Sequence, residues 1–406
     1  MCSALDRDNL VRALKRVISN KGSPGVDGMD VRALPAYLKR HWPQLRTELL
    51  TGRYQPQPVK RVEIDKTGGG KRKLGVPIVV DRFIQQALLQ VLQPIFEPGF
   101  SESSFGFRPG RSAHQAVSRA QGFVAEGYRW VVDLDLEKFF DRVNHDLLMG
   151  RLAKRVHDRQ ILRLIRRYLQ AGVLERGLVS PSEEGTPQGG PLSPLLSNIL
   201  LTDLDRELER RGHRFVRYAD DANIYVKSER AGRRVKAGLT RFLEVRLKLK
   251  VNEAKSAVAP PWQRKFLGFG FTARRPYRRR VALAPLERFK AEVRRLTGRT
   301  RGVSLARVIE ELQRYLIGWQ AYFGFAEVRT LFRELDKWIC RRLRCYLWKQ
   351  WGRRRYRELK ARGVSRDLAW NTVKSAHGPW RLSASPALSI ALPTAYFRAL
   401  GVPTLC

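Results

Sequence analysis

Two adjacent aspartates, Asp220 and Asp221, are the residues of this chain whose types and spacing point most directly to chemistry. Apolar residues flank them on both sides, Phe215-Val216 before and Ile224-Tyr225-Val226 after. This pattern predicts a β-hairpin whose turn carries the two acids. Neighbouring carboxylates repel each other unless a cation neutralises them, and hard oxygen ligands of this kind suit Mg²⁺. The competing interpretation is a solvated hairpin tip, because Asp is a common turn residue.

A second acidic stretch lies upstream, in the apolar run 130–136, which has the composition of a buried strand. The run contains Asp133 and Asp135 and continues into Glu137-Lys138-Phe139-Phe140-Asp141. An unpaired charge in a buried strand is costly, so metal ligation is the simplest compensation. Alternate residues of a strand share a face, which leaves both Asp133 and Asp135 as candidates.

The overall charge indicates the kind of partner. The 406 residues carry a formal net charge of +40, and charge of this size favours a polyanion whose phosphates it neutralises. An anionic membrane is the competing partner, but no apolar run approaches the roughly 20 residues of a spanning helix. No signal peptide opens the chain, and the four cysteines form no C-x-x-C pair. We therefore expect a cytoplasmic nucleic-acid-binding protein without membrane contact.

Hydrophobic periodicity predicts the elements that must position the acids. We expect helices over 6–18, 34–50 and 81–92, another from 113, and two more over 195–208 and 231–248. The runs 59–64 and 71–77 read as two strands joined by the Gly68-Gly69-Gly70 turn. A phosphate-binding P-loop is excluded there, because the Gly-Lys-Ser/Thr signature is absent.

The last third of the chain is more basic than the rest. From Arg274 onward, basic residues outnumber acidic ones by roughly three to one. Amphipathic periodicity predicts helices over 286–296, 305–323 and 328–347, which together suggest a three-helix basic bundle. We expect its aromatic residues to form the core. The expected RNA contacts are basic residues on the opposite faces, namely Arg294, Arg295, Arg341, Arg342 and Arg344.

Taken together and in order, the motifs resemble those of the group II intron reverse transcriptases, the intron-encoded maturases of bacteria. The fingers motifs are Lys73-Leu74-Gly75-Val76-Pro77 and Ser104-Phe105-Gly106-Phe107-Arg108-Pro109. The palm motifs are Asp135-x-x-x-Phe139-Phe140-Asp141, Thr186-Pro187-Gln188-Gly189 and Tyr218-Ala219-Asp220-Asp221. Phe266-Leu267-Gly268-Phe269 resembles the primer grip, and Gly318-Trp319 with Tyr322-Phe323 resembles the helical thumb, or maturase domain.

The resemblance implies an α+β fold of the right-hand polymerase type, with an antiparallel sheet in the fingers and palm and an all-α thumb. The expected domains are 1–115 (N-terminal extension and fingers), 116–275 (palm, interleaved with the fingers), 276–350 (thumb or maturase domain) and 351–406 (a basic segment that is a candidate for DNA binding). No C-x-x-C pairs or His-Asn-His arrangement follow the thumb. We therefore expect the compact class that lacks an endonuclease domain, and with it a preference for DNA that is already single-stranded or nicked.

The family also implies roles for individual residues. Asp135, Asp220 and Asp221 would hold two Mg²⁺ ions, with Mn²⁺ as a possible substitute, and Asp133 would have a structural role. Lys255 resembles the lysine proposed to protonate pyrophosphate. Phe140 would exclude the ribose 2′-OH, and Phe139 is the second candidate for this role. The competing interpretation is that the ring is only part of the hydrophobic core. The other expected nucleotide contacts are Gln188 in its glycine-flanked loop and, for the triphosphate of the incoming dNTP, Arg72, Lys73 and Arg82.

The implied function is that of an RNA-directed DNA polymerase, a two-metal nucleotidyltransferase. It would bind group II intron RNA to assist splicing and copy it into DNA for intron mobility. Its partners would be the intron RNA, an RNA template with a DNA primer, dNTPs and target DNA. Two alternatives stay open: a splicing-only maturase, which the complete acid set disfavours, and a domesticated reverse transcriptase in defence or DNA repair.

Overall fold

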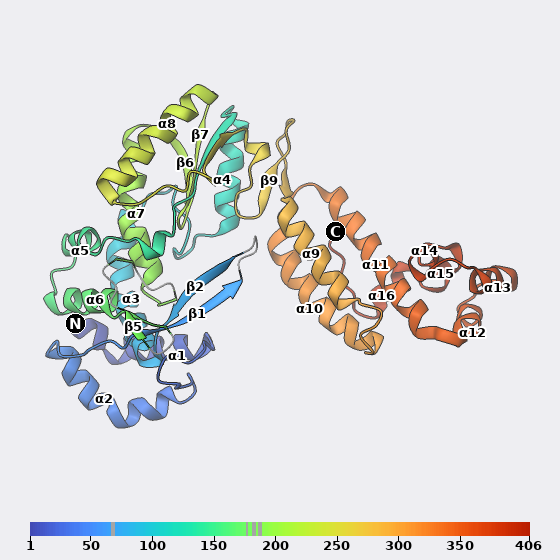
Figure 1. Ribbon diagram of the computed structural model, residues 1–406, viewed down its shortest axis with the longest axis horizontal. Helices are drawn as coiled ribbons and strands as arrows, with labels where there is room; N and C mark the ends of the chain where they lie inside the picture. The colour runs from blue at the N-terminus through green and yellow to red at the C-terminus, as the bar shows by residue number, and fades with distance from the viewer. Residues whose placement is uncertain (66–69, 176–177, 181–183, 186–188) are drawn as a thin grey trace. The chain divides into compact units, whose positions relative to one another are not determined.

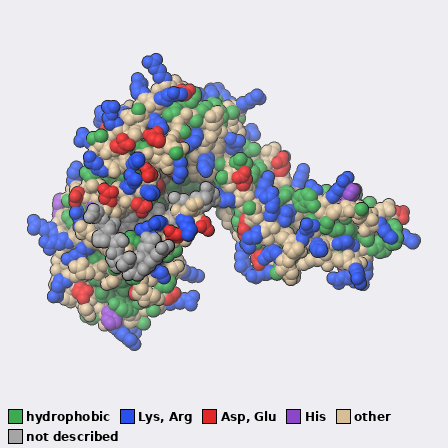
Figure 2. All heavy atoms as spheres, viewed as in Figure 1, with side chains coloured by type: hydrophobic (Ala, Val, Ile, Leu, Met, Phe, Trp, Pro, Cys, Tyr) green, Lys and Arg blue, Asp and Glu red, His purple; other side chains and the backbone are tan. Residues whose placement is uncertain are grey.

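The computed structural model describes residues 1–65, 70–175, 178–180, 184–185 and 189–406 (Figure 1). The chain divides into two compact units, Met1–Pro260 and Pro261–Cys406. The first unit contains all the strands that carry the predicted acids, and the second is mainly helical. Lys and Arg side chains are spread over the visible face of each unit (Figure 2). Within the described ranges, no helix is both long and apolar enough to cross a membrane.

An antiparallel sheet of four strands lies at the centre of the first unit, in the order β6-β7-β3-β8. The strands are β3 (Trp130–Leu134), β6 (Arg214–Tyr218), β7 (Asp221–Val226) and β8 (Ala257–Ala259). The predicted hairpin is formed by β6 and β7, whose last pair joins Tyr218 to Asp221. Strand β3 lies between β7 and β8, with Leu134 opposite Ala222. The fold therefore places the end of β3 beside the hairpin turn.

Helices cover both faces of this sheet. On one face, α8 (Glu229–Phe242) packs closely because Gly232 has no side chain: a Cβ there would lie 2.5 Å from the Val258 side chain. On the other face, Phe123 of α4 (Ala113–Ala125) contacts Tyr225, with ring centroids 5.5 Å apart. Helix α7 (Ser193–Arg210) contacts β6 as well as α3 (Val79–Phe96). The predicted helix over 231–248 ends its α-helical part at Phe242, and a π-helical turn, η4 (Leu243–Leu247), follows.

A second sheet of the first unit has the order β2-β1-β4-β5. Strands β1 (Val59–Asp65) and β2 (Lys71–Val76) form the predicted antiparallel hairpin, whose turn lies outside the described residues. Strand β1 also pairs in parallel with β4 (Val173–Glu175), which is antiparallel to β5 (Leu178–Ser180). The remaining longer helices of this unit are α1 (Arg7–Ser19), α2 (Leu34–Leu50), α5 (His145–Ala153) and α6 (Arg159–Gln170).

The second unit contains the predicted three-helix bundle, formed by α9 (Leu283–Leu296), α10 (Leu305–Phe323) and α11 (Arg329–Trp351). Its aromatic residues form the core as expected. Phe289 and Phe332 are fully buried, and the Phe289 and Trp319 rings lie 4.4 Å apart. A small hairpin of β9 (Phe269–Phe271) and β10 (Arg279–Val281) joins this core, because Phe269 packs against Tyr322 and Phe323. The domain boundary that we predicted at 275/276 falls inside this hairpin, whereas the compact units meet at 260/261.

Five short helices follow the bundle, namely α12 (Arg355–Ala361), α13 (Arg366–Lys374), α14 (Pro379–Leu382), α15 (Pro386–Ala391) and α16 (Thr394–Ala399). Arginines of α11 that we predicted as RNA contacts fasten this segment. Arg341 donates to the Trp380 carbonyl at 3.0 Å and lies 4.1 Å from the centre of the Trp380 ring. Arg344 donates to the Leu392 carbonyl at 2.9 Å. Arg342 binds Thr297 Oγ1 at 2.6 Å, at the end of α9. The three arginines are half-buried and make these internal contacts, while their contact with RNA stays a prediction.

Candidate active site

The aspartate pair lies at the tip of the β6–β7 hairpin. Ala219 and Asp220 form the two-residue turn, and Ala219 adopts a left-handed conformation with φ of 58°. Asp220 is half-buried, and Asp221 is exposed as the first residue of β7. Leu134 of β3 pairs with Ala222 of β7, so Asp135, one residue after Leu134, and Asp221, one residue before Ala222, continue the same antiparallel register. Because side chains alternate along a strand, Asp135 and Asp221 belong to the same face of the sheet.

The backbone of Asp135 is held by the segment that leads into β8. Its N–H donates to Ser256 Oγ at 3.0 Å, and its carbonyl accepts from the Asn252 N–H at 2.8 Å. The same segment places Lys255 so that its Nζ lies 3.9 Å from Asp135 Oδ2. The structure thus brings Lys255, 120 positions later in the sequence, beside the acid that the motif spacing selects.

The carboxylates suit a divalent cation by their chemistry. Mg²⁺ takes hard oxygen ligands, usually one or two carboxylates together with substrate phosphates, and the hairpin tip and the end of β3 present such carboxylates. Among the described residues, however, no three His, Cys, Asp or Glu side chains converge into a formed metal cluster. The backbone positions of Asp135, Asp220 and Asp221 therefore lie at one end of the sheet, but their described side chains do not converge on a common point. Asp133 occupies the position two residues before Asp135 on the same face, opposite Asn223.

The two phenylalanines that follow Asp135 differ in burial. Phe139 is 2% exposed and belongs to the main core, whereas Phe140 is half-buried. Their rings meet edge to face with centroids 5.2 Å apart. Phe139 therefore packs in the core against Phe140, which keeps part of its own surface exposed.

Gln188 lies outside the described residues, as do Thr186 and Pro187, but Gly185 and Gly189 on either side of them make close contacts. On one side, the Gly185 N–H donates to the Val143 carbonyl at 2.8 Å, and a Cβ at Gly185 would lie 2.8 Å from the Phe140 carbonyl oxygen. On the other side, a Cβ at Gly189 would lie 2.6 Å from the carbonyl oxygen of Gly75 in β2. The two glycines therefore contact the palm motif at Phe140 and the fingers hairpin, respectively.

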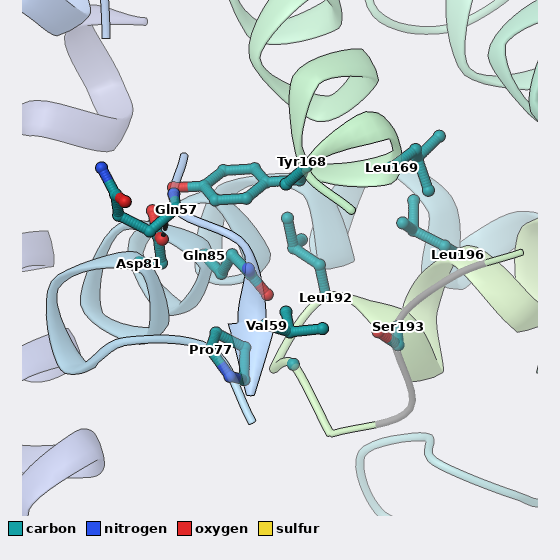
Figure 3. A pocket seen from close by; sticks show the side chains of 12 residues that line it. Gln57, Val59, Pro77, Asp81, Gln85, Tyr168, Leu169, Leu192, Ser193 and Leu196 are labelled. Carbon is teal, nitrogen blue, oxygen red and sulfur yellow. Dashed lines mark hydrogen bonds between the residues drawn. The ribbon is translucent and has the colours of Figure 1, made fainter. Parts of the chain in front are cut away.

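A small hollow opens between α3, α6 and the start of α7 (Figure 3). Asp81 lies at its edge, where its carboxylate accepts from Tyr54 Oη at 2.8 Å and from the Gln57 N–H at 3.1 Å. Burial raises the pKa of Asp81 to about 6, and these hydrogen bonds oppose the rise without cancelling it. Gln85 closes the same hollow, because its Oε1 lies 2.5 Å from where a Cβ at Gly190 would be.

The predicted triphosphate contacts fall into different environments. Lys73 is exposed on β2, where it pairs in register with Glu63 of β1. Arg72 lies beside it on the same strand, opposite Ile64. Arg82 is 9% exposed, and its Nη2 donates to the Ser23 carbonyl at 2.6 Å. Arg82 is thus largely buried and binds the N-terminal loop, and its contact with the triphosphate stays a prediction.

Several residues that pack against the hairpin turn were not among the predicted site residues. Arg217, three positions before Asp220 in the sequence and part of β6, is fully buried and bonds to Asp205 and Asn198 of α7. Gly106 packs against the turn, since a Cβ there would lie 2.2 Å from the Ala219 backbone nitrogen. A charged residue in an otherwise apolar strand segment, Phe215-Val216-Arg217, was the available signal for Arg217. Nothing in the local pattern points to Asp205 or Asn198, which lie on another element.

Comparison with family models matches residues 64–271 to the reverse transcriptase (RNA-dependent DNA polymerase) family. Residues 286–363 match the group II intron, maturase-specific domain. The first match contains every predicted site residue from Arg72 to Lys255. The second lies within the helical unit and covers α10, α11 and α12.

Individual proteins show the same likeness. Protein YkfC of Escherichia coli is 41% identical over 208 residues, which are 50% of this chain and 55% of that protein. Group II intron-encoded protein LtrA of Lactococcus lactis is 30% identical over 329 residues, 65% of this chain and 55% of that protein. The chain thus spans about half the length of these curated relatives. Among solved structures, apo telomerase from Candida tropicalis is 12% identical, with a TM-score of 0.47 over 85% of this chain and 63% of that one.

Proposed function

This chain belongs to the reverse transcriptase family and carries a maturase-specific domain of the group II intron type, and from this premise we propose that it is an RNA-directed DNA polymerase that also assists intron splicing. One observation carries the polymerase part. Asp135 and Asp221 lie at the same end of two neighbouring antiparallel strands, next to the pair Leu134–Ala222, and Lys255 lies beside Asp135. The substrates that we propose are an RNA template with a DNA primer and the four dNTPs.

Divalent cations held by Asp135 and Asp220, with Asp221 as a further ligand, would stabilise the attacking 3′-oxygen and the leaving pyrophosphate. Two Mg²⁺ ions are proposed, with Mn²⁺ as a substitute. The protein's own residues have the other tasks. Lys255 donates a proton to the leaving pyrophosphate, and its charge balances that of Asp135 beforehand. Exposed Lys73, together with Arg72 on the same strand, binds the triphosphate.

Phe140 excludes the ribose 2′-OH in this proposal. Its ring is half-buried, and the buried Phe139 ring that packs against it occupies the space into which it could otherwise move. Gln188 is proposed as a further nucleotide contact from its motif, and the neighbouring Gly185 and Gly189 contact the Phe140 backbone and β2, respectively. The selection of deoxynucleotides would therefore depend on shape, not on a hydrogen bond.

The splicing role is proposed from the maturase-specific domain and from charge. Group II intron RNA is the proposed RNA partner, and target DNA is proposed for the basic segment after the bundle, whose residues Arg353, Arg354 and Arg357 are exposed. Intron mobility would follow from copying the intron RNA into such DNA in the bacterial cytoplasm. A reverse transcriptase domesticated for defence or DNA repair would share the polymerase site but would have no dependence on intron RNA.

The test is primer extension on an RNA template, combined with binding of a group II intron RNA. Asp220→Asn should abolish DNA synthesis and leave RNA affinity intact, because the substitution removes negative charge near a polyanion. Asp146→Asn, which removes an equal charge from an exposed position of α5, is the matched control and should retain synthesis. A wild-type protein that binds intron RNA and extends no primer would reduce the proposal to a splicing-only maturase. Extension without any preference for intron RNA would support the domesticated enzyme.

A further inference from the structure

A buried arginine lies directly behind the aspartate turn. Both Arg217 and its partner Asp205 have side chains that are 0% exposed. The pair is bidentate, with Nε 2.7 Å from Asp205 Oδ1 and Nη2 2.6 Å from Asp205 Oδ2. The third nitrogen, Nη1, donates to Asn198 Oδ1 at 2.9 Å and to the Ala219 carbonyl at 2.8 Å. The guanidinium therefore links α7 to the residue that precedes Asp220.

The main chain around this arginine is held as well. The Arg217 N–H donates to the Ser103 carbonyl, and the Arg217 carbonyl accepts from the Phe105 N–H, each at 2.9 Å. Asn198 also donates from Nδ2 to the Gly106 carbonyl at 2.9 Å. The loop that contains Ser103, Phe105 and Gly106 is thus tied to both β6 and α7.

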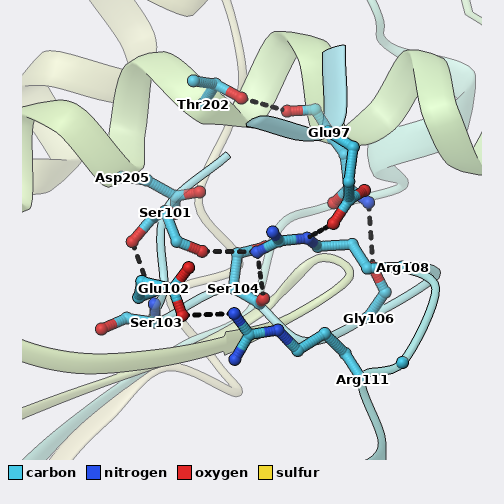
Figure 4. Close-up of polar contacts among 12 residues, drawn as sticks. Glu97, Ser101, Glu102, Ser103, Ser104, Gly106, Arg108, Arg111, Thr202 and Asp205 are labelled. Carbon is cyan, nitrogen blue, oxygen red and sulfur yellow. Dashed lines mark hydrogen bonds and ion pairs between the residues drawn. The ribbon is translucent and has the colours of Figure 1, made fainter. Parts of the chain in front are cut away.

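A second arginine fixes the far side of that loop. Arg108 donates to Glu97 at 2.7 Å and to the carbonyls of Ser101 and Ser104 at 2.5 and 2.7 Å (Figure 4). Gly106 then presses on the turn from outside, at the Ala219 nitrogen. Ala219 is therefore held at two atoms. Its carbonyl accepts a hydrogen bond from Arg217, and its nitrogen contacts Gly106 so closely that no other residue would fit there.

Stability alone does not account for this arrangement. A fully buried ion pair contributes no more to stability, as a rule, than apolar residues of similar volume. An apolar pair has no N–H to donate to the Ala219 carbonyl, and Lys cannot form the planar fork that reaches three acceptors at once. We therefore relate the arginine to the position of the Ala219–Asp220 turn, which its hydrogen bond to the Ala219 carbonyl holds.

We propose that Arg217 is a positioning residue. Asp205 and Asn198 hold its guanidinium, which in turn fixes the turn at Ala219 in its left-handed conformation. This keeps the Asp220 carboxylate close enough to Asp135 for the two to bind the same cations. The inference rests on the proposed polymerase function. Arg217 itself touches neither substrate nor cation, since it is fully buried. It acts through the turn, so its loss should change how tightly the site holds a divalent cation as well as how fast the enzyme turns over.

The test uses the whole 406-residue chain with Arg217→Lys, Arg217→Met and Gly106→Ala. Arg151→Lys is the matched control, because Arg151 also pairs with an aspartate of α7, Asp203 at 2.6 Å, but does not contact the turn. Gly150→Ala is the control for the glycine change, because its Cβ would meet nothing within 4 Å. Folding is checked by thermal melting, and folded variants are compared per active molecule.

Two measurements separate positioning from structural support. The single-turnover rate at saturating Mg²⁺ should fall by about 100-fold in Arg217→Lys, as expected for a misplacement of roughly 1 Å. Mn²⁺ binding to the complex with primer–template, followed by the loss of the free-ion electron paramagnetic resonance signal, should weaken several-fold. Gly106→Ala should show both effects, and the two control variants should show neither.

The inference fails if folded Arg217→Lys melts at lower temperature yet keeps wild-type Mn²⁺ affinity and rate, because Arg217 then only stabilises the fold. If Arg217→Met does not fold, Gly106→Ala still decides, since it displaces the turn and leaves the ion pair in place. A wild-type protein without primer extension would instead refute the proposed function. In that case, the positioning role would still be supported if the wild-type protein binds Mn²⁺ and Arg217→Lys binds it more weakly.

Discussion

The Nζ atom of Lys255 lies 3.9 Å from Oδ2 of Asp135, and this contact joins the segment before β8 to the end of β3. Both side chains are accessible to solvent, at 66% for Lys255 and 32% for Asp135, so the contact is a weak ion pair by itself. Its position matters more than its strength. It places a proton donor beside the acid that the proposed reaction uses.

Lys255→Ala should therefore slow DNA synthesis with little effect on folding. General acid catalysis typically contributes about 10² to 10⁴ in rate, and we expect a loss in the lower part of that range in single-turnover extension. Lys250→Ala is the matched control, because Lys250 forms a similar exposed pair with Glu137 at 3.7 Å. Equal losses in the two variants would show that only local charge matters and would remove the proton-donor role.

Phe140→Ala should raise the incorporation of ribonucleotides relative to deoxynucleotides, because it removes the ring that we place against the 2′-OH. The protein should stay folded, since Phe140 is only half-buried. Phe139→Ala is the comparison: truncating this core ring should cost about 3–5 kcal/mol of unfolding free energy. A folded Phe140→Ala enzyme that still rejects ribonucleotides would move the selection to another residue.

The stability of the first unit should depend on pH through Asp81. Its folded-state pKa of about 6 is higher than its ordinary value of 3.8, so the folded protein holds this proton more tightly than the unfolded chain. The resulting stabilisation is present at low pH and is lost as pH rises from about 4 through 6, by at most about 3 kcal/mol. Urea unfolding between pH 4.5 and 8 measures it.

Asp81→Asn is the informative variant for that profile. It should be less stable than wild type at low pH, because the amide accepts fewer hydrogen bonds from Tyr54 and the Gln57 N–H. The difference should shrink as pH rises, because only wild type then buries a charge. If the two proteins give parallel profiles over the range, Asp81 does not titrate as described.

The salt dependence of RNA binding should separate two sets of arginines. Arg353, Arg354 and Arg357 are exposed, whereas Arg341, Arg342 and Arg344 bind the Trp380 and Leu392 carbonyls and Thr297. Changing the exposed set to Gln should flatten the log–log slope of intron RNA affinity against KCl by about 0.7–0.9 per lost phosphate contact.

Changing the internal set to Gln removes the same charge and should leave that slope nearly unchanged. It should instead raise hydrogen exchange in α14 and α15, because the bonds that hold this segment to α11 are lost. Equal slopes for both triple variants would show that the exposed arginines do not touch phosphate. A flattened slope in the internal set alone would restore our sequence-based assignment of these arginines.

Local patterns were sufficient for most of the elements and for the positions of the acids. The predicted helix at 34–50 and the start of the helix at 113 agree with α2 and α4, because amphipathic periodicity and caps are properties of neighbouring residues. The hairpin around Asp220 was predictable for the same reason. The order of the motifs identified the family, which the comparison with family models confirmed.

Tertiary structure alone decided how charged side chains are used. In sequence, Arg82, Arg217 and Arg341 are three cations of a chain with 78 Lys and Arg residues. In the fold, they bind the N-terminal loop, α7 and the segment after the bundle, respectively. A side chain of this length reaches partners that are set by the packing of distant elements, and no local pattern encodes that packing. The sequence determined which acids this protein has for its chemistry, and the packing of α7 against β6 decided how their turn is held.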